Sequence, residues 1–221
     1  MQKVLDYLGS TEWEFAEVLV VDDGSRDGTV ALAESWAARC PRVRVLRNPG
    51  NRGKGYSVRH GMLAAQGEWR LFTDADLSSP IEEVDKLWAA ARDRQADVAF
   101  GSRALDRSLV GVHQSFFREM MGRLFNVLMR MVTGLPFHDT QCGFKLFSAA
   151  AAEAVFSRQL LERFGFDVEV LYIATRLRYR AAEVPVRWND VLGTKVSLWS
   201  GIDAFADPLR VRFNGLRGRY K

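Results

Sequence analysis

Short apolar runs alternate with polar, glycine-rich loops and helix-like segments along the first half of the chain. Residues 18–21, 43–46, 69–73 and 97–101 each form a run of the length typical of a buried strand. Helical segments follow the first three runs, at about 27–39, after the loop 47–55 and from Pro80 onward. This alternation predicts an α/β fold with a Rossmann-like, mostly parallel sheet and helices on both faces.

Capping residues mark where two of these helices begin. Asp27 is a predicted cap, and Ser79 followed by Pro80 predicts a second helix start, with two glutamates at the positive end of its dipole. The second half is less regular. There we expect a helix with a broad apolar face over 114–133, a helix over 167–177 and a last strand over 182–188.

The composition is that of one domain with a sizeable core. The chain has 221 residues, 48% of them hydrophobic, and a net charge of +4 with a pI near 9.3. This mild basic excess favours an anionic partner without identifying one. Cys40 and Cys142 have no metal-like spacing, which favours a reduced, cytosolic protein. No apolar run approaches the ~20 residues of a membrane-spanning helix, so we expect any membrane contact to be peripheral.

Two aspartates, Asp74 and Asp76, stand one residue apart directly after the predicted strand 69–73. Ligands of parallel sheets bind beyond the carboxyl ends of the strands, where both "DAD" and the earlier "DDGS" fall. Paired carboxylates are typical ligands of Mg²⁺ or Mn²⁺, with substrate phosphates and water completing the shell. An isolated pair of this kind is also common in solvated loops, so the context of surrounding motifs has to decide whether these two aspartates bind a metal.

That context is an ordered set of motifs. "VVDDGSRDGT", "NRGKG", "DADLSSP", "GSR", "DTQCGFKLF", "FGFDVEVLYIA" and "EVPVRW" follow one another along the chain. In this order they resemble the family-2 glycosyltransferases of the GT-A fold, and among these the dolichyl-phosphate (polyprenyl-phosphate) β-glucosyltransferases most. The resemblance covers residues 1–200, which we expect to form a single GT-A domain, followed by a basic tail over 201–221.

The resemblance implies roles for particular residues. Asp23 matches an aspartate that contacts the nucleotide base, whereas Asp22 only shapes the turn. Asp76 matches a direct ligand of the Mg²⁺ or Mn²⁺ ion, and Asp74 matches a residue that meets the metal and the ribose or sugar. Ser78 replaces a glutamine of mannose-transferring relatives and is a poor third ligand. The other implied substrate-binding residues are Lys54, Arg103, Gln141 and Lys195.

Asp139 matches a candidate catalytic base of related inverting enzymes. A phosphate monoester has a second pKa near ~6, so a lipid-phosphate acceptor is mostly ionised at pH 7 and needs no strong base. We therefore expect Asp139 to position the acceptor or to act as a modest base. The alternative is a purely structural role, in which Asp139 is a turn aspartate that binds backbone N–H groups. Cys142 is expected to pack rather than react.

The function implied is inverting, metal-dependent transfer of a hexose, expected to be glucose from UDP-glucose, to a polyprenyl or dolichyl phosphate. A direct displacement at the anomeric carbon needs no covalent sugar intermediate, and the metal offsets charge on the leaving diphosphate. GDP-mannose as donor and a non-catalytic nucleotide-binding module are the alternatives. A nucleic-acid-binding role is disfavoured because no aromatic–basic stripe is present, and a nucleotidyltransferase because no glycine-rich signature follows the first strand.

A lipid acceptor implies a membrane-facing side. We expect a peripheral protein on the cytoplasmic face of the membrane, with the apolar helix 114–133 or the basic tail at the lipid surface. Core packing, a dimer face and a solvated tail are the alternatives, and the oligomeric state stays open.

The chain departs from the family at its start. The family opens with a strand that ends in "PAYNE" before the first helix, and this chain opens with that helix, "MQKVLDYL". We expect the missing first strand to leave unpaired strand edges and to remove one wall of the base pocket. We expect the chain to be a fragment or to have a start assigned too far downstream, and a degenerate protein with weak or no activity is the alternative.

Overall fold

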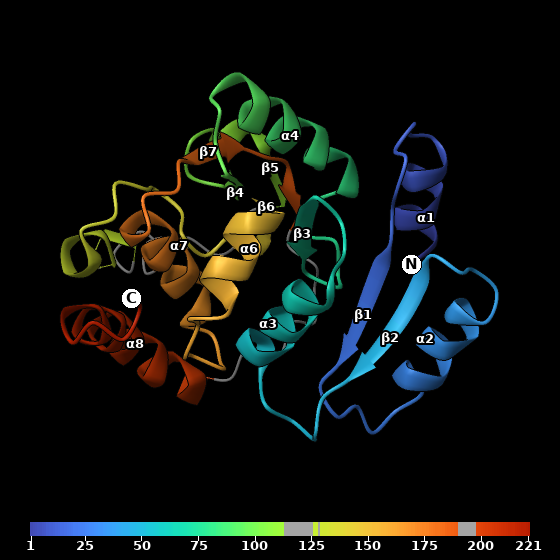
Figure 1. The fold of residues 1–221 in the computed structure, drawn as a ribbon, viewed down its shortest axis with the longest axis horizontal. Helices are drawn as coiled ribbons and strands as arrows, with labels where there is room; N and C mark the ends of the chain where they lie inside the picture. Colours follow the sequence, from blue (N-terminus) through green and yellow to red (C-terminus); the bar gives the residue numbers. More distant parts are fainter. Residues whose placement is uncertain (113–125, 128, 190–197) are drawn as a thin grey trace.

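The computed structural model describes residues 1–112, 126–127, 129–189 and 198–221 (Figure 1). Its first half contains α1 (Gln2–Gly9), β1 (Val18–Asp22), α2 (Thr29–Ala37), β2 (Val43–Arg47), α3 (Lys54–Ala64), β3 (Trp69–Thr73), the short 3₁₀ helix η1 (Ile81–Glu83), α4 (Val84–Asp93) and β4 (Val98–Ser102). Its second half contains η2 (Arg107–Leu109), β5 (Val110–Val112), β6 (Phe144–Ser148), α6 (Ala149–Phe156), α7 (Phe166–Arg176), β7 (Ala181–Pro185), β8 (Trp188–Asn189) and α8 (Leu198–Leu216).

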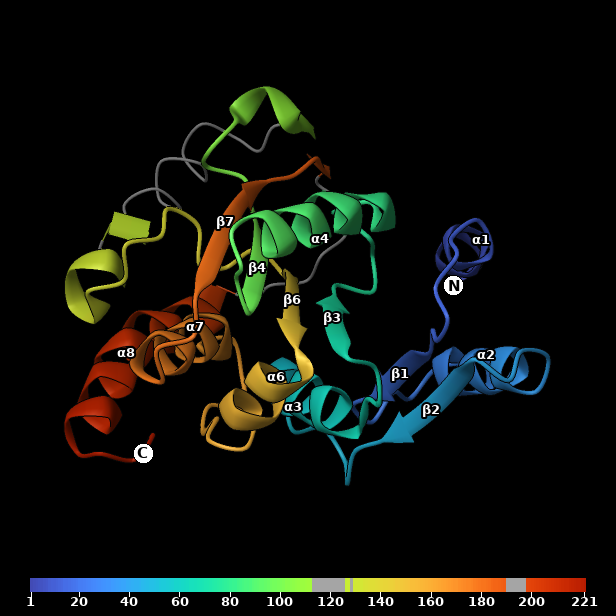
Figure 2. The same ribbon diagram turned by 45° about the horizontal axis from the view of Figure 1, so that its top comes forward.

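Within the described residues, the strands form one four-stranded sheet and two pairs. The larger sheet has the order β3–β6–β4–β7, which can be followed in Figure 2. β4 and β7 are parallel, as are the pairs β1–β2 and β5–β8, so the predicted parallel character is confirmed for these strands. β6 departs from it because it runs antiparallel between β3 and β4, with Leu146 opposite both Leu71 and Ala99.

Helices cover both faces of the four-stranded sheet, as predicted. The alternation of side chains along the strands assigns each residue to one face. Phe72, Phe100 and Phe147 pack with α3, α6 and α7 in one core cluster. Ala99 and Leu146 point to the opposite face and pack with α1 and α4 in a second cluster. Figure 2 shows α4 on one side of the strands and α3, α6 and α7 on the other.

The strands β1 and β3 each have one unpaired edge in the described part of the chain. β1 pairs with β2 alone, and β3 pairs with β6 alone. The expected unpaired edges are therefore present. In Figure 1 the pair β1–β2 lies to one side together with α1 and α2, apart from the larger sheet.

Two local predictions need correction. Ser79 is not the helix cap, because Pro80 holds the cap position with φ −56° and ψ 144°, the first turn is η1, and α4 begins at Val84. Ser79 is buried at the position before the cap. The predicted strand 182–188 is also split, since β7 ends at Pro185 and β8 begins at Trp188.

The predicted cap at Asp27 is also wrong, because Gly28 holds the cap position of α2. The carboxylate of Asp27 still accepts a hydrogen bond from the backbone N–H of Thr29, the first residue of α2, at 3.0 Å. In the predicted helix 114–133, residues 126, 127 and 129–133 are helical, and the remainder lies outside the described residues. Within the described part of the chain, no helix combines the length and the apolar character needed to cross a bilayer.

Candidate active site

The predicted site residues lie where three strands end. Asp23 follows β1, Asp74 follows β3 and Arg103 follows β4. The segment 135–143, which leads into β6, crosses the ends of β3 and β4 and brings Asp139 to the same place. Direct contacts link Asp23 to the glycine-rich loop (residues 47–55), that loop to Asp74, and Asp74 to the segment before β6, as the next paragraphs describe.

The aspartates after β1 organise two loops. Asp22 accepts hydrogen bonds from the N–H groups of Gly24 and Ser25, both at 3.1 Å, so it holds its own turn. Asp23 instead accepts from the backbone N–H groups of Arg52 and Gly53, both at 2.8 Å. The carboxylate of Asp23 therefore fixes the glycine-rich loop to the end of β1.

Lys54, the first residue of α3, extends to the carboxylate after β3. Its Nζ lies 2.5 Å from Oδ1 of Asp74, and both side chains remain about one-third exposed. Burial alone lowers the pKa of Lys54, but the charges of Asp167 and Asp74 outweigh it and raise the pKa above its ordinary value. The site therefore keeps a cation beside an exposed carboxylate.

Asp74 also contacts the segment before β6. Its N–H donates to the carbonyl of Gly143 at 3.1 Å, and a Cβ added to Gly143 would lie 2.3 Å from Oδ2 of Asp74. Only glycine leaves room for the carboxylate at this approach. Asp76 is exposed, and its Oδ1 accepts from both the N–H (3.0 Å) and the hydroxyl (2.9 Å) of Ser78.

Leu77, between Asp76 and Ser78, has a φ of +52°, which is rare for a residue that carries a Cβ. Such strained positions concentrate at binding and catalytic sites, where the surrounding structure holds them in place. The strain therefore marks the turn that carries Asp76 as a specified conformation rather than a loose surface loop.

Arg103 and Asp139 form a two-pronged ion pair. Nε and Nη2 of Arg103 lie 2.7 and 2.9 Å from the two carboxylate oxygens, and the N–H groups of Arg103 and Gln141 also donate to them. Asp139 is 1% exposed. Burial raises its pKa, but the charge and hydrogen bonds of Arg103 outweigh burial, so the net pKa lies below the ordinary value. Bidentate contacts of this kind fix the orientation of both side chains as well as pairing their charges.

The remaining predicted residues make fewer described contacts at the strand ends. Gln141 lies beside this ion pair, where its backbone N–H bonds Asp139. Lys195 lies outside the described residues. Cys142 is buried in a core cluster, and burial raises the pKa of its thiol to about 11, which agrees with a packing role.

Sequence reasoning missed several residues under the site. Lys145 on β6 is fully buried and pairs with Asp167 at the start of α7, while donating to the carbonyl of Cys142 at 2.6 Å. Asn48 joins Asp23 to Ser57. A lysine inside the otherwise apolar "GFKLF" was the available signal, because lysine is almost never fully buried without a partner.

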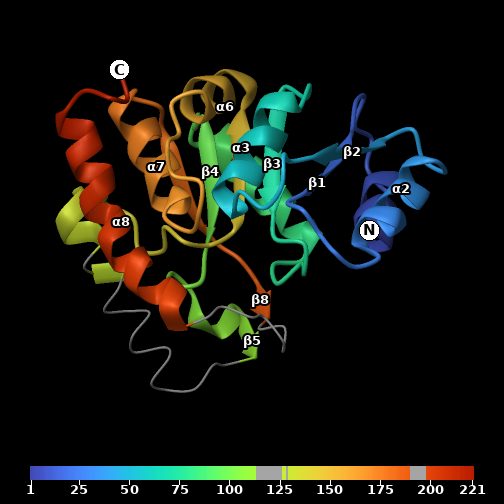
Figure 3. The ribbon, with the colours of Figure 1, turned by 90° about the horizontal axis from the view of Figure 1, so that it is seen from below.

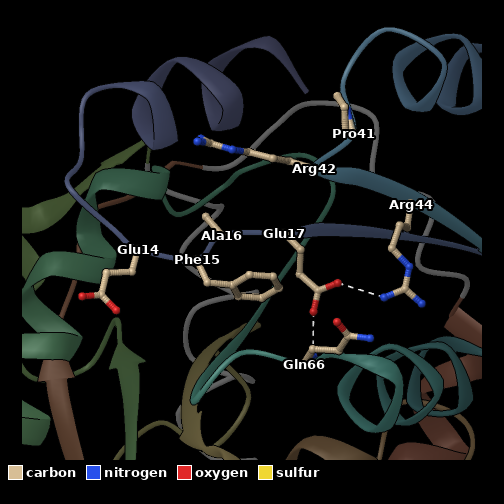
Figure 4. Close-up of a pocket in the computed structure, with 8 residues that line it drawn as sticks. All are labelled: Glu14, Phe15, Ala16, Glu17, Pro41, Arg42, Arg44 and Gln66. Carbon is tan, nitrogen blue, oxygen red and sulfur yellow. Dashed lines mark hydrogen bonds and ion pairs between the residues drawn. The ribbon is translucent and has the colours of Figure 1, made fainter.

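A pocket lies at the other end of β1 and β2. It is lined by the segment 14–17, by Pro41, Arg42 and Arg44, and by Gln66 (Figure 4). The carboxylate of Glu17 points into it, paired with Arg44 at 3.0 Å and with the N–H of Gln66 at 2.6 Å. This pocket is separate from the carboxyl ends of the strands, where the predicted site residues meet.

The donor set at β3 fits a hard divalent cation. In the described ranges, no cluster of three or more His, Cys, Asp or Glu side chains forms a metal site. Mg²⁺ commonly takes only one or two protein carboxylates and completes its shell with substrate phosphates and water. Asp74 and Asp76 supply two carboxylates at the surface, so they fit a cation that arrives with a phosphorylated ligand.

Comparisons with known proteins identify the family of the chain. The family described as glycosyl transferase family 2 matches residues 1–156. The chain is 38% identical over 214 residues to the dolichyl-phosphate β-glucosyltransferase of Drosophila melanogaster and 37% identical to that of Homo sapiens, covering 93% of this chain in both cases. It spans 65% and 66% of the length of these two relatives, which is just under two thirds.

Solved structures share the fold. Glucosyl-3-phosphoglycerate synthase of Mycobacterium tuberculosis with phosphoglyceric acid superposes with a TM-score of 0.67, covering 96% of this chain and 75% of that one. The same protein with Mn²⁺, UDP-glucose and phosphoglyceric acid gives a TM-score of 0.66 over 96% and 74%. At 18% identity the likeness establishes the GT-A fold alone. The fold predicted from the motifs is thereby confirmed.

Proposed function

The chain belongs to glycosyl transferase family 2, and we propose that it transfers a glucosyl group from UDP-glucose to a dolichyl or polyprenyl phosphate. The choice of substrates is supported by the names of its relatives, the dolichyl-phosphate β-glucosyltransferases. The observation that carries the proposal is the meeting of Lys54 with Asp74, two residues before Asp76, at the end of β3. This arrangement offers both a cation and two carboxylates to a diphosphate.

The proposed reaction is a single displacement with inversion at the anomeric carbon. The acceptor phosphate attacks, the bond from the anomeric carbon to the UDP oxygen breaks, and UDP leaves with the electron pair. Asp74 and Asp76 would hold Mg²⁺ or Mn²⁺, which supplies charge stabilisation to the leaving diphosphate. Lys54 binds and orients the diphosphate from the other side through its charged ammonium group.

Arg103 and Asp139 have a positioning role in this proposal. The acceptor is already mostly ionised at neutral pH, because its second pKa is about 6. Asp139 is saturated with donors from Arg103 and Gln141, so it holds the guanidinium in place and takes no proton. Arg103 also lies 5.5 Å from the ring centre of Trp188, which confines it further.

The test is calorimetric titration of UDP-glucose into the protein with and without Mn²⁺. We expect binding that depends on the metal and that weakens at least tenfold in Asp76→Ala, since one of two carboxylate ligands is lost. Asp106→Ala is a matched control, because Asp106 is an exposed aspartate that bonds a serine two residues later in the same way but starts η2.

The outcomes separate the alternatives. Binding of GDP-mannose in preference to UDP-glucose would replace the glucosyl donor in this proposal. Binding of neither nucleotide sugar to a demonstrably folded protein would sink the proposed donor site. Binding of UDP-glucose without turnover on polyprenyl phosphate would favour a non-catalytic nucleotide-binding module.

The lipid acceptor implies contact with a membrane, and α8 offers a surface for it. Leu209, Phe213 and Leu216 are exposed at helical spacing and form an apolar stripe. On an ideal helix, Arg212 lies to one side of this stripe, and Arg217, the residue after α8, lies with its guanidinium carbon 4.0 Å from the ring centre of Phe213. Apolar side chains flanked by arginines are typical of helices that lie in the headgroup region of an anionic bilayer. We therefore propose that the protein contacts the membrane peripherally through the apolar stripe of α8, and we expect it on the cytoplasmic face.

A further inference from the structure

The glycine-rich loop rests directly on a loop from far along the chain. This second loop, residues 157–165 between α6 and α7, is called the bracing loop here. A Cβ added to Gly55 would lie 2.6 Å from the carbonyl oxygen of Leu161, and one added to Gly53 would lie 2.6 Å from that of Glu162. The two backbones therefore touch without room for a side chain between them.

Hydrogen bonds lock the two loops together. The N–H of Tyr56 donates to the carbonyl of Glu162 at 3.0 Å. The side chain of Gln159, which is 1% exposed, donates to the carbonyls of both Gly55 (2.9 Å) and Leu161 (2.8 Å). The guanidinium of Arg52 also pairs with both carboxylate oxygens of Glu162. The position of the bracing loop thus sets the position of the residues on either side of Lys54.

The bracing loop is in turn held by one buried carboxylate. Glu169 on α7 is fully buried and accepts hydrogen bonds from the N–H groups of Leu160 (3.1 Å) and Leu161 (2.8 Å). Its third donor is the hydroxyl of Tyr220, at 2.7 Å. Tyr220 is the second-last residue of the chain, is 2% exposed, and packs edge-on against Tyr172.

We propose that Glu169 and Tyr220 are positioning residues for the nucleotide-sugar site, through which the carboxyl-terminal end of the chain fixes the bracing loop and hence Lys54 against Asp74. A buried carboxylate is costly unless its donors are well placed, so a purely structural role would be filled as well by an apolar side chain. Unlike an apolar side chain, Glu169 fixes the orientation of the bracing loop, because its carboxylate accepts hydrogen bonds from two neighbouring N–H groups of that loop. The ligand named here rests on the proposed function, whereas the coupling between the loops does not.

The first measurement is hydrogen exchange, followed by mass spectrometry, on Tyr220→Phe. This variant keeps the buried ring and removes only the hydroxyl. We expect amides in residues 47–58 and 157–165 to exchange about tenfold faster, the effect of losing one hydrogen bond to a carboxylate. Tyr7→Phe is the matched control, because the Tyr7 hydroxyl donates to Asp85 at 2.6 Å in the other core cluster. In the control these two segments should exchange as in the wild type.

The second measurement is the Kd for UDP-glucose in the presence of Mn²⁺. We expect it to rise about tenfold in Tyr220→Phe and to stay unchanged in Tyr7→Phe, while the two variants lose similar thermal stability. Unchanged exchange in residues 47–58 of Tyr220→Phe overturns the inference, as does a uniform rise across the whole chain. Faster exchange there with an unchanged Kd also overturns it. If the wild type binds no UDP-glucose, the proposed function fails, and the exchange data alone decide the coupling.

Discussion

Arg103 determines what Asp139 can do. The guanidinium occupies both carboxylate oxygens, and two backbone N–H groups add to it, so the acceptor capacity of Asp139 is largely used. The same contacts hold the pKa of Asp139 below its ordinary value against the effect of burial. A carboxylate in this state is a weak base, which favours positioning over proton transfer.

Removing the charge of the Asp139 carboxylate should lower the free energy of unfolding. In Asp139→Asn the guanidinium of Arg103 loses its counter-ion, and we expect unfolding free energy to fall by about 3 kcal/mol, the low end for a broken buried pair because Arg103 keeps one-third of its surface in water. Urea denaturation measures this. Glu17→Gln, which breaks the exposed pair with Arg44, should cost less than about 1 kcal/mol, and an equal loss in both variants would contradict the assignment.

The pH dependence of this contribution has a definite sign. A carboxylate whose pKa is lowered by folding stabilises the native state above its unfolded pKa of about 3.9 and loses that contribution as the pH falls through the native pKa. The difference in unfolding free energy between the wild type and Asp139→Asn should therefore be constant from pH 8 to about 5 and shrink below about 4. A difference that shrinks between pH 8 and 6 would instead show a raised pKa and a base near neutrality.

At the scale of elements, the start of α3 depends on a glycine. Gly55→Ala forces a methyl group against the carbonyl oxygens of Leu161 and Arg163, at 2.6 and 2.8 Å from the added Cβ. We expect a loss of about 2–3 kcal/mol in unfolding free energy, as for other overpacked sites, and a weaker affinity for UDP-glucose. Gly9→Ala is the control, because nothing lies within 4 Å of a Cβ there, and calorimetry should find it neutral or slightly stabilising.

The sequence predicted the strands that bear the site, because each is a short apolar run ended by turn residues. β1, β2, β3 and β4 lie within one residue of the predicted runs. β6 and α6 were missed. The apolar run of β6 is interrupted by Lys145, whose burial depends on Asp167, and no local pattern reveals an antiparallel strand inserted between β3 and β4.

The sequence predicted which residue types stand at the strand ends of the candidate site, but not the contacts between them. These contacts join segments that are distant in the sequence: Asp23 bonds the glycine-rich loop, Asp139 pairs with Arg103, and Lys54 pairs with Asp74. The roles assigned to these residues stay predictions. Residues 159–163 of the bracing loop, which contact the glycine-rich loop, belong to none of the motifs, because their carbonyl groups make many of the contacts and any residue supplies a carbonyl.

At the scale of the whole molecule, α8 lies on the side opposite α2 (Figure 3). We expect the protein to sediment with vesicles that contain anionic phospholipid at low salt, and Phe213→Ser to weaken this by about tenfold, since burial of the ring is worth about 1.5 kcal/mol or more. Leu32→Ser is the matched control, because Leu32 on α2 is at least as exposed, at 61% against 50% for Phe213. Equal vesicle binding by the wild type, Phe213→Ser and Leu32→Ser would show that α8 is not the lipid-facing surface.

The arginines beside the stripe should act through charge. Arg212→Gln and Arg217→Gln should each weaken vesicle binding by about 1 kcal/mol at low ionic strength and have little effect at high salt. Arg26→Gln, an exposed arginine in the turn after β1, controls for net charge. Binding that is insensitive to salt and to both arginine substitutions would mean that apolar contact alone holds the protein on lipid.

The separation of β1–β2 from the larger sheet also has a consequence for local unfolding. All five residues of β1 are only half-buried, and neither core cluster of the described residues includes a residue of β1 or β2. The contact with the rest runs through α3, where a Cβ on Gly61 would lie 3.1 Å from Val21. We expect such a unit to open locally at a lower free energy than global unfolding. A protease or a chaperone would therefore meet this part of the native protein first, while the scaffold that carries Asp74 and Arg103 is still intact.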